Sequence, residues 1–109
     1  MSEKLISDYV IVGKLVFTSG MTGGPGDVKT QIKNTLEKLR KTLEEAGTSF
    51  DNVIKATVYL ADISDRKRYL NDLWREAFPK NLPARTCVQV GMDPGVAVEI
   101  EMIAKIPEK

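Results

Sequence analysis

The stretch of sequence that decides the fold begins at residues 27–47, DVKTQIKNTLEKLRKTLEEAG, and continues to residue 61. Its apolar residues recur at intervals of three and four, the spacing of one helical stripe, at Val28, Ile32, Leu36, Leu39, Leu43 and Ala46. Asp27 stands at the N-cap position, and Gly47 stands where helices commonly end. The pattern predicts an amphipathic helix between these two residues.

Residues 53–61, VIKATVYLA, change to a period of two and predict a strand. We expect one face to carry Ile54, Ala56, Val58 and Leu60, and the other to carry Lys55, Thr57 and Tyr59. Before the helix, Tyr9–Val12 and residues 15–19 are rich in β-branched and aromatic side chains, with residues 13–14 as the turn between them. These segments predict a hairpin of two further strands.

A second helix is predicted to run to Phe78, with Ser64 or Asp65 as its N-cap. Its inward-facing residues would be Leu70, Leu73, Trp74, Ala77 and Phe78. Two strands follow, at residues 86–90 and 96–106, separated by a turn. In the last of them, apolar residues alternate with residues that include Glu99 and Glu101.

The element order is therefore β-β-α-β-α-β-β, in a single domain covering residues 1–109. Two amphipathic helices that share one mixed sheet predict an α+β two-layer sandwich, with both helices on one face of the sheet. The other face would carry Val, Ile and Ala beside polar residues. We therefore expect that face to meet another subunit.

Charge and composition argue against several classes of partner. Lys and Arg total 16 while Asp and Glu total 15, and a net charge of +1 gives no electrostatic case for nucleic acid or an anionic membrane. Cys87 is the only cysteine and histidine is absent, which removes an intramolecular disulfide, the usual general base and the commonest metal ligand. The start at Met1–Lys4 is too charged for a signal peptide, and no apolar run approaches the ~20 residues of a spanning helix. We expect a cytoplasmic protein without a metal.

The loop at residues 20–26, GMTGGPG, lies between a strand and a helix, as a phosphate cradle would. Position 29 is Lys, so the third glycine of that motif is missing and an ordinary turn is the favoured interpretation. Basic clusters at residues 38–41 and 66–68 are interleaved with acidic residues on the predicted helices. They favour solvated helix faces with local ion pairs, and no interleaved aromatic residues support binding of single-stranded RNA.

A third cluster is the segment 83–90, PARTCVQV, followed by Glu99 and Glu101. A short turn between these strands would make them antiparallel neighbours, with Arg85 opposite one of the glutamates. Arginine can hold a carboxylate bidentately, and a partly desolvated glutamate can transfer protons. Spacing alone favours a cross-strand salt bridge with an inert, buried Cys87. A surface lysine is then the expected partner of Glu101.

The segment 83–90 combines proline-alanine-arginine, a small residue, cysteine and a valine-rich strand. Further characteristic stretches occur in order at residues 15–20, 43–47, 53–60, 71–78 and 98–104. Together they resemble the Rid/YjgF family of reactive-intermediate (imine/enamine) deaminases. The resemblance runs from about residue 13 to residue 106.

This resemblance implies a homotrimer of chorismate-mutase-like subunits with active sites at the three interfaces. It implies cofactor-independent hydrolysis of 2-imino and 2-enamino acids, such as 2-aminoacrylate, to 2-keto acids and ammonia, a form of metabolite damage control. By the same resemblance, Arg85 would hold the substrate carboxylate, and Glu99 would position or activate water. Asn71 would approach from the same or a neighbouring subunit, and the main chain around Cys87 and Gly20 would line the pocket.

The chemistry of imines agrees with these roles. A free imine hydrolyses in water unaided, so proximity, a carboxylate clamp and one proton-handling group are enough. Without a histidine to activate it, Cys87 is not expected to be a nucleophile. Three alternatives remain: a non-catalytic trimer that binds small carboxylates such as 2-keto acids, an endoribonuclease or translation inhibitor, and a pericyclic mutase. Glu99 argues against the first, neutral charge and the missing histidine against the second, and a single clamp arginine against the third.

Overall fold

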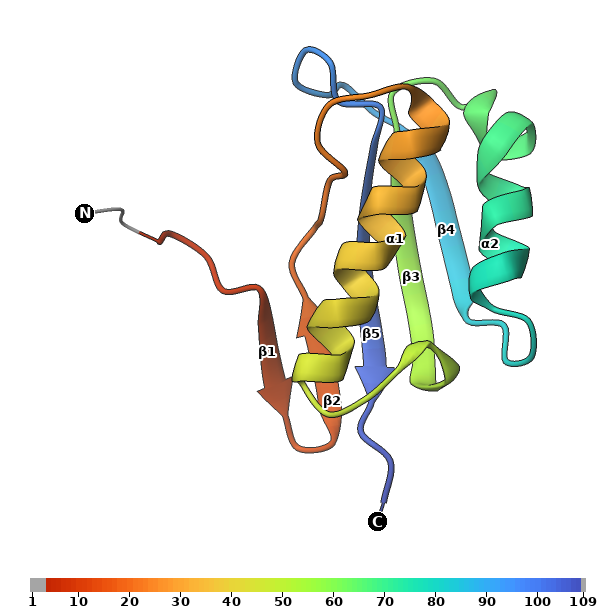
Figure 1. Cartoon of the computed structure of the whole chain (residues 1–109). Helices are drawn as coiled ribbons and strands as arrows, with labels where there is room; N and C mark the ends of the chain where they lie inside the picture. The colour runs from red at the N-terminus through yellow and green to blue at the C-terminus, as the bar shows by residue number, and fades with distance from the viewer. Residues whose placement is uncertain (1–3, 109) are drawn as a thin grey trace.

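The computed structural model describes residues 4–108 (Figure 1). Most of the charged N-terminal segment discussed above, residues 1–3, therefore lies outside the described part. The strands are β1 (Tyr9–Val12), β2 (Leu15–Thr18), β3 (Val53–Leu60), β4 (Ala84–Gln89) and β5 (Val98–Lys105). The helical elements are α1 (Val28–Glu45), the 3₁₀ turn η1 (Phe50–Asn52), the π-helical turn η2 (Arg66–Leu70) and α2 (Asn71–Ala77). The predicted order of strands and main helices is confirmed.

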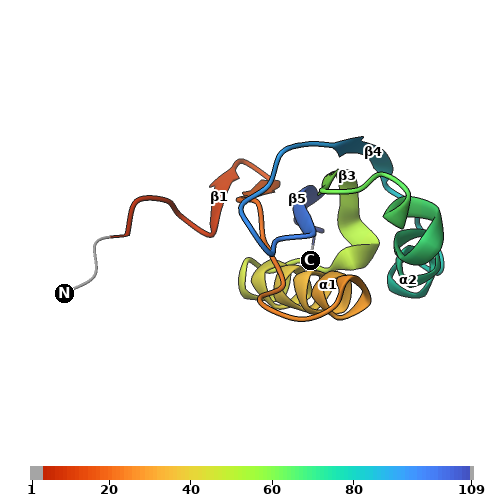
Figure 2. The ribbon, with the colours of Figure 1, turned by 90° about the horizontal axis from the view of Figure 1, so that it is seen from above.

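Both helices lie on one face of the sheet, which confirms the two-layer α+β sandwich (Figure 2). The strand order is β1-β2-β5-β3-β4, with β3 and β4 parallel and the other neighbouring pairs antiparallel. The core between the layers is formed by α1, α2 and the inner faces of β3 and β5, with Ile32, Leu39, Leu43, Val58, Leu60, Ile100 and Ala104 fully buried. Burial of each large aliphatic side chain contributes about 1.5–3 kcal/mol.

The caps of α1 are those expected from its sequence. The Asp27 carboxylate accepts a 2.8 Å hydrogen bond from the backbone N–H of Thr30. Gly47 has a φ of 93°, a conformation that residues with a Cβ rarely adopt. The helix therefore begins and ends where local sequence alone requires.

The predicted antiparallel pairing of β4 with β5 is wrong. β4 pairs in parallel with β3, with Arg85 opposite Ala56, and β3 separates it from β5. One reason is connectivity, because a crossover through helical segments brings consecutive strands together in parallel. The other is burial: the inner residues of β5 are at most 1% exposed, so β5 takes a central place and the more exposed β4 takes the edge.

Two smaller predictions are also wrong. A register shift directly after Val53 turns that residue into the core and leaves Ile54 44% exposed on the other side. The side chain of Asp65 makes no capping hydrogen bond at the second helical segment. Instead, the Asp62 carboxylate accepts hydrogen bonds from the backbone N–H and the hydroxyl of Ser64, at 2.9 and 2.6 Å.

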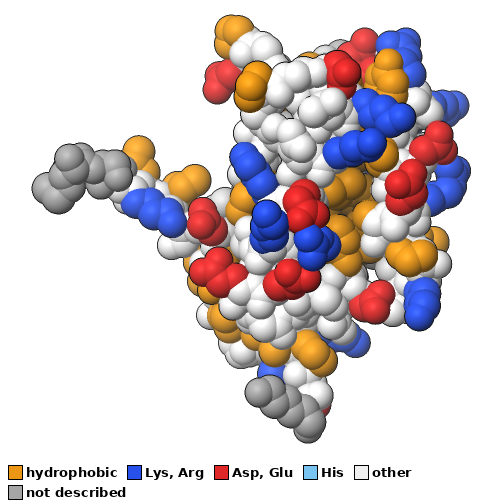
Figure 3. Space-filling view, viewed as in Figure 1, with side chains coloured by type: hydrophobic (Ala, Val, Ile, Leu, Met, Phe, Trp, Pro, Cys, Tyr) orange, Lys and Arg blue, Asp and Glu red, His pale blue; other side chains and the backbone are white. Residues whose placement is uncertain are grey.

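The helix side of the molecule carries interspersed positive and negative side chains (Figure 3). Arg40 contacts both Glu37 and Glu44, and Arg68 lies 3.6 Å from Asp65. These contacts agree with solvated faces and local ion pairs at Arg40 and Arg68, whereas Arg66 departs from that interpretation because it is half-buried. Within residues 4–108, no helix is both long and apolar enough to cross a membrane.

The face of the sheet opposite the helices is open and partly apolar, as predicted. Val10, Val12 and Phe17 are 54%, 61% and 39% exposed on it. Towards β3 and β4 the same face becomes polar and carries the glutamates of β5. We call it the open face below.

Candidate active site

Glu99 and Gly20, two of the predicted site residues, lie against each other on the open face. A Cβ added to Gly20 would lie 2.2 Å from Oε2 of Glu99, so only a residue without a side chain leaves the carboxylate in place. Gly20 is held there because Met21 exchanges backbone hydrogen bonds of 2.8 and 3.0 Å with Ile100 of β5. The loop that the sequence marks as an ordinary turn therefore has a defined place beside Glu99.

Tyr59 joins this group from β3. It lies opposite Glu99 in the strand register, and its hydroxyl donates a 3.2 Å hydrogen bond to the Glu101 carboxylate. Burial, followed by the charges of Glu101 and Glu99, raises the pKa of Tyr59, so its hydroxyl stays protonated as a donor. Tyr59, and not the expected lysine, is thus the partner of Glu101.

Two adjoining hollows of about 320 and 280 Å³ share Glu99, Gly91 and Met92 in their walls. Tyr59 and Glu101 also line the larger one. The smaller one is completed by Thr22, Asp93 and Val96. The Glu99 carboxylate is therefore accessible to a small molecule from two sides. Within the described residues, no group of three or more carboxylate or thiol side chains is arranged to hold a metal ion.

Arg85 belongs to a second group, on the helix side of β4. Its Nη2 donates a 3.0 Å hydrogen bond to Oδ1 of Asn71, and its Cζ lies 5.2 Å from the centre of the Trp74 ring. A guanidinium over an indole face is stabilised by about 0.5–2 kcal/mol. A hollow of about 280 Å³ lies beside Arg85, lined also by Asn71, Trp74, Arg75, Leu82 and Pro83. The approach of Asn71 to Arg85 thus occurs within one chain.

Cys87 lies two residues after Arg85 and is half-buried against the core. Burial raises the pKa of its thiol, although Arg85 and Arg66 act in the opposite direction. A protonated thiol is a poor nucleophile, which supports a structural role. Because β4 is an edge strand, the peptide groups around Cys87 that face away from β3 are free to bind a ligand or another subunit.

The two groups lie on opposite faces of the sheet. Arg85 is opposite the buried Ala56, whereas Glu99 is opposite Tyr59 on the open face. Arg85 and Glu99 are also two strands apart, roughly 10 Å at the usual strand spacing. One chain therefore brings Gly20 to Glu99 and Asn71 to Arg85, but it does not bring Arg85 to Glu99.

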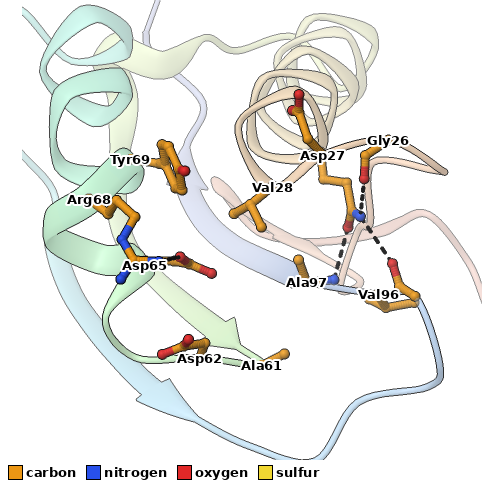
Figure 4. Close-up of a pocket in the computed structure, with 12 residues that line it drawn as sticks. Gly26, Asp27, Val28, Ala61, Asp62, Asp65, Arg68, Tyr69, Val96 and Ala97 are labelled. Atoms are coloured by element: carbon orange, nitrogen blue, oxygen red, sulfur yellow. Dashed lines mark hydrogen bonds and ion pairs between the residues drawn. The ribbon is translucent and has the colours of Figure 1, made fainter.

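A larger cavity, of about 570 Å³, lies elsewhere, between the start of α1, η2 and residues 95–97 (Figure 4). The buried Gln31 amide donates to the carbonyls of Gly26 and Gly95 and accepts from the N–H of Ala97, all within 3.0 Å. Its polar groups thus hold the loop before β5 onto α1. None of the predicted site residues lines this cavity.

Comparisons with known proteins assign the family. The family model described as Endoribonuclease L-PSP matches residues 2–106. The chain belongs to the Rid/YjgF family. Its Rid relatives include a RutC family protein of Pyrococcus abyssi, 38% identical over 90% of this chain and 84% of that protein.

Other Rid relatives are similar over most of their length. The 2-iminobutanoate/2-iminopropanoate deaminase of Rattus norvegicus is 39% identical over 90% of this chain and 77% of that protein. The crystal structure of RidA from an Antarctic Psychrobacter has a TM-score of 0.89 and 32% identity, covering 97% of this chain and 92% of that one.

Two residues of this Rid chain belong to the candidate site although sequence analysis did not single them out. Tyr59 was expected only as part of a polar strand face, and its nearness to Glu99 follows from the pairing of β3 with β5. Trp74 was expected only in the core. The sequence does place Trp74 three residues after Asn71, on the same side of a helix, and this spacing could have indicated that both residues approach Arg85.

Proposed function

We propose that the protein hydrolyses 2-imino and 2-enamino acids to 2-keto acids and ammonia, without a cofactor, at sites shared between subunits of a homotrimer. Two side chains with fixed surroundings carry this proposal. Glu99 lies in a hollow directly against Gly20, and Arg85 is oriented by Asn71 and Trp74. The names of Rid relatives as 2-iminobutanoate/2-iminopropanoate deaminases support the substrate class.

In the proposed reaction, Arg85 binds the substrate carboxylate through its two-pronged guanidinium. Glu99 takes a proton from a water molecule as the water oxygen forms a bond to the imine carbon. That proton then passes to nitrogen, which gives a carbinolamine. The hydroxyl proton of the carbinolamine follows through Glu99 to nitrogen, the carbon–nitrogen bond breaks as the carbonyl forms, and the 2-keto acid and ammonia leave. An enamine first takes a proton on carbon and becomes the imine. Every step moves only protons and water, so the atoms and electrons balance.

The positions of the two groups support a site between subunits. Arg85 and Glu99 lie on opposite faces of one sheet, so a single small ligand can touch both only when they come from different chains. The open face also exposes apolar side chains, among them Val10, Val12 and Phe17. Such a surface is typical of an interface.

We expect a stable homotrimer in solution for this reason. Sedimentation velocity and multi-angle light scattering at micromolar concentration should give three times the 12.1 kDa chain mass. Phe17→Glu, which puts a charge on the open face, should shift the protein to smaller species. A monomer mass for the parent protein would contradict the interfacial site.

A coupled assay tests the activity directly. A PLP-dependent dehydratase generates the enamine from serine or threonine, and 2-keto acid formation is followed with and without the protein. We expect faster keto-acid formation with the protein present. Equal rates, combined with keto-acid binding that Arg85→Ala removes, would favour a non-catalytic carboxylate binder. Cleavage of RNA by the purified protein would support the activity that the family description names instead.

Gly20→Ala should lower turnover without unfolding the protein. The added methyl group would meet the far end of the Glu99 side chain, which can rotate away from its working position. Misplacement of a catalytic group by an ångström can cost on the order of 10²-fold in rate. Gly23→Ala is the matched control: its methyl group would meet the Gln31 backbone at 2.1 Å, so it should lower thermal stability. A normal rate for a folded Gly20→Ala protein would contradict the role given to this contact.

Cys87→Ser should keep most of the activity, since the proposed reaction does not use the thiol. Burial raises the thiol pKa, so alkylation by iodoacetamide should be slow at neutral pH and should accelerate only above the usual thiol range. Steady-state kinetics and mass spectrometry measure the two effects. Complete loss of activity in a folded Cys87→Ser protein would show that Cys87 takes part in catalysis.

A further inference from the structure

The helical segment beside β4 places a second arginine near the proposed clamp. At one end of this segment, the backbone N–H of Ile63 donates a 2.9 Å hydrogen bond to the side chain of Gln89. At the other end, Asn71 contacts Arg85. Residues 63–71 therefore run alongside β4 in the opposite direction, so the part near residue 66 lies beside Cys87.

The π-helical turn η2 sets which side chain points at β4. The backbone N–H of Asn71 donates to the carbonyl of Arg66, so Arg66 lies one turn before Asn71 on the same side of the helix. Burial agrees, because Arg66 is half-buried while Lys67 and Arg68 are exposed.

Within the described part of the chain, Arg66 differs from the neighbouring arginines in having no charged partner. Arg68 contacts Asp65, and Arg75 contacts Asp72. Among residues 4–108, by contrast, the guanidinium of Arg66 makes no hydrogen bond or ion pair. The positive charges of Arg85 and Arg66 both lower the pKa of the Cys87 thiol, against the larger effect of burial. This agrees with two guanidiniums beside the same stretch of the edge strand.

We infer that Arg66 binds a second carboxylate of the ligand, so that the site prefers imines and keto acids derived from dicarboxylic amino acids. This inference rests on the proposed function, in which Arg85 binds the first carboxylate. Arg85 is on β4, and Arg66 lies beside Cys87, two residues further along the same strand. Two residues of a strand span roughly 6.6 Å, so the two arginines are anchored about that far apart along β4. That spacing suits the two ends of a short dicarboxylic acid such as 2-oxoglutarate. A half-buried unpaired guanidinium is also better stabilised by an anion than by water alone.

Binding of two keto acids tests the inference independently of catalysis. Isothermal titration calorimetry compares 2-oxoglutarate with 2-oxobutanoate on the parent protein and on Arg66→Gln, Arg66→Lys and Lys67→Gln. The parent should bind 2-oxoglutarate roughly tenfold more tightly, the usual value of one charge-assisted hydrogen bond. Arg66→Gln should abolish this preference and leave 2-oxobutanoate binding unchanged, and Arg66→Lys should keep part of it. Lys67→Gln removes the same charge from the neighbouring exposed position and should keep the preference.

The outcomes separate this inference from the proposed function. Equal binding of both keto acids by the parent, or a preference that survives in Arg66→Gln, overturns the role of Arg66 and leaves the monocarboxylate site intact. A preference lost equally in Lys67→Gln shows a general effect of charge and also overturns it. Binding of neither keto acid overturns the carboxylate clamp, and the inference with it. A preference that depends on Arg66, in a protein that fails the imine assay, supports the inference while the catalytic proposal fails.

Discussion

Glu99→Gln is expected to keep the assembled protein and its keto-acid binding while turnover falls by roughly 10²–10⁴-fold, the usual share of a positioned general acid–base. The amide has nearly the same shape as the carboxylate, so it still fits against Gly20, but it cannot accept the proton of the attacking water. The coupled imine assay measures the rate, and light scattering with calorimetry measures assembly and binding.

Glu101→Gln is the matched control for this variant. Glu101 lies two residues away on the same face and accepts a hydrogen bond from Tyr59, a bond that the amide oxygen of Gln can also accept. We therefore expect a rate close to that of the parent. If Glu101→Gln were inactive and Glu99→Gln had a normal rate, Glu101 and not Glu99 would be the residue that accepts the proton from water. Parent-like rates in both variants would refute the catalytic proposal in favour of the carboxylate binder.

Arg85→Ala is expected to abolish the rate acceleration. Removal of one partner of a desolvated charge pair costs about 2–5 kcal/mol, so kcat/KM should fall and keto-acid binding should weaken together. Arg85→Lys should leave a weak remnant, since an ammonium group cannot reproduce the bidentate contact or the flat stacking on Trp74.

Arg40→Ala is the control for the loss of one positive charge. Arg40 lies on α1 and, among the residues that the structure describes, forms ion pairs only with Glu37 and Glu44 on the solvated helix face. This variant should therefore behave like the parent. Thermal unfolding of Arg85→Ala should show that the Trp74 region still folds. Unchanged keto-acid production by a folded Arg85→Ala protein would refute the clamp.

Much of the fold was predictable because local signals determine it. The apolar stripe of α1, its Asp27 cap and Gly47 each act within a few residues, and the structure confirms all three. The element order and the single helical layer follow from the same kind of pattern. The largest failure, β4 beside β5, concerned which strands pair, and pairing depends on burial summed over the whole sheet.

For the site, the sequence by itself determined which residues are candidates, since the spaced motifs around Gly20, Arg85 and Glu99 are visible without any structure. Only the tertiary structure decided how they are grouped. Because β3 lies between β4 and β5, Arg85 and Glu99 are two strands apart. The register places Arg85 beside the buried Ala56 and Glu99 beside Tyr59, so the two face opposite sides of the sheet and Arg85 lies against Trp74 rather than a glutamate. Side-chain direction alternates along each strand, but which face is covered depends on where the helices pack, and residues distant in sequence settle that.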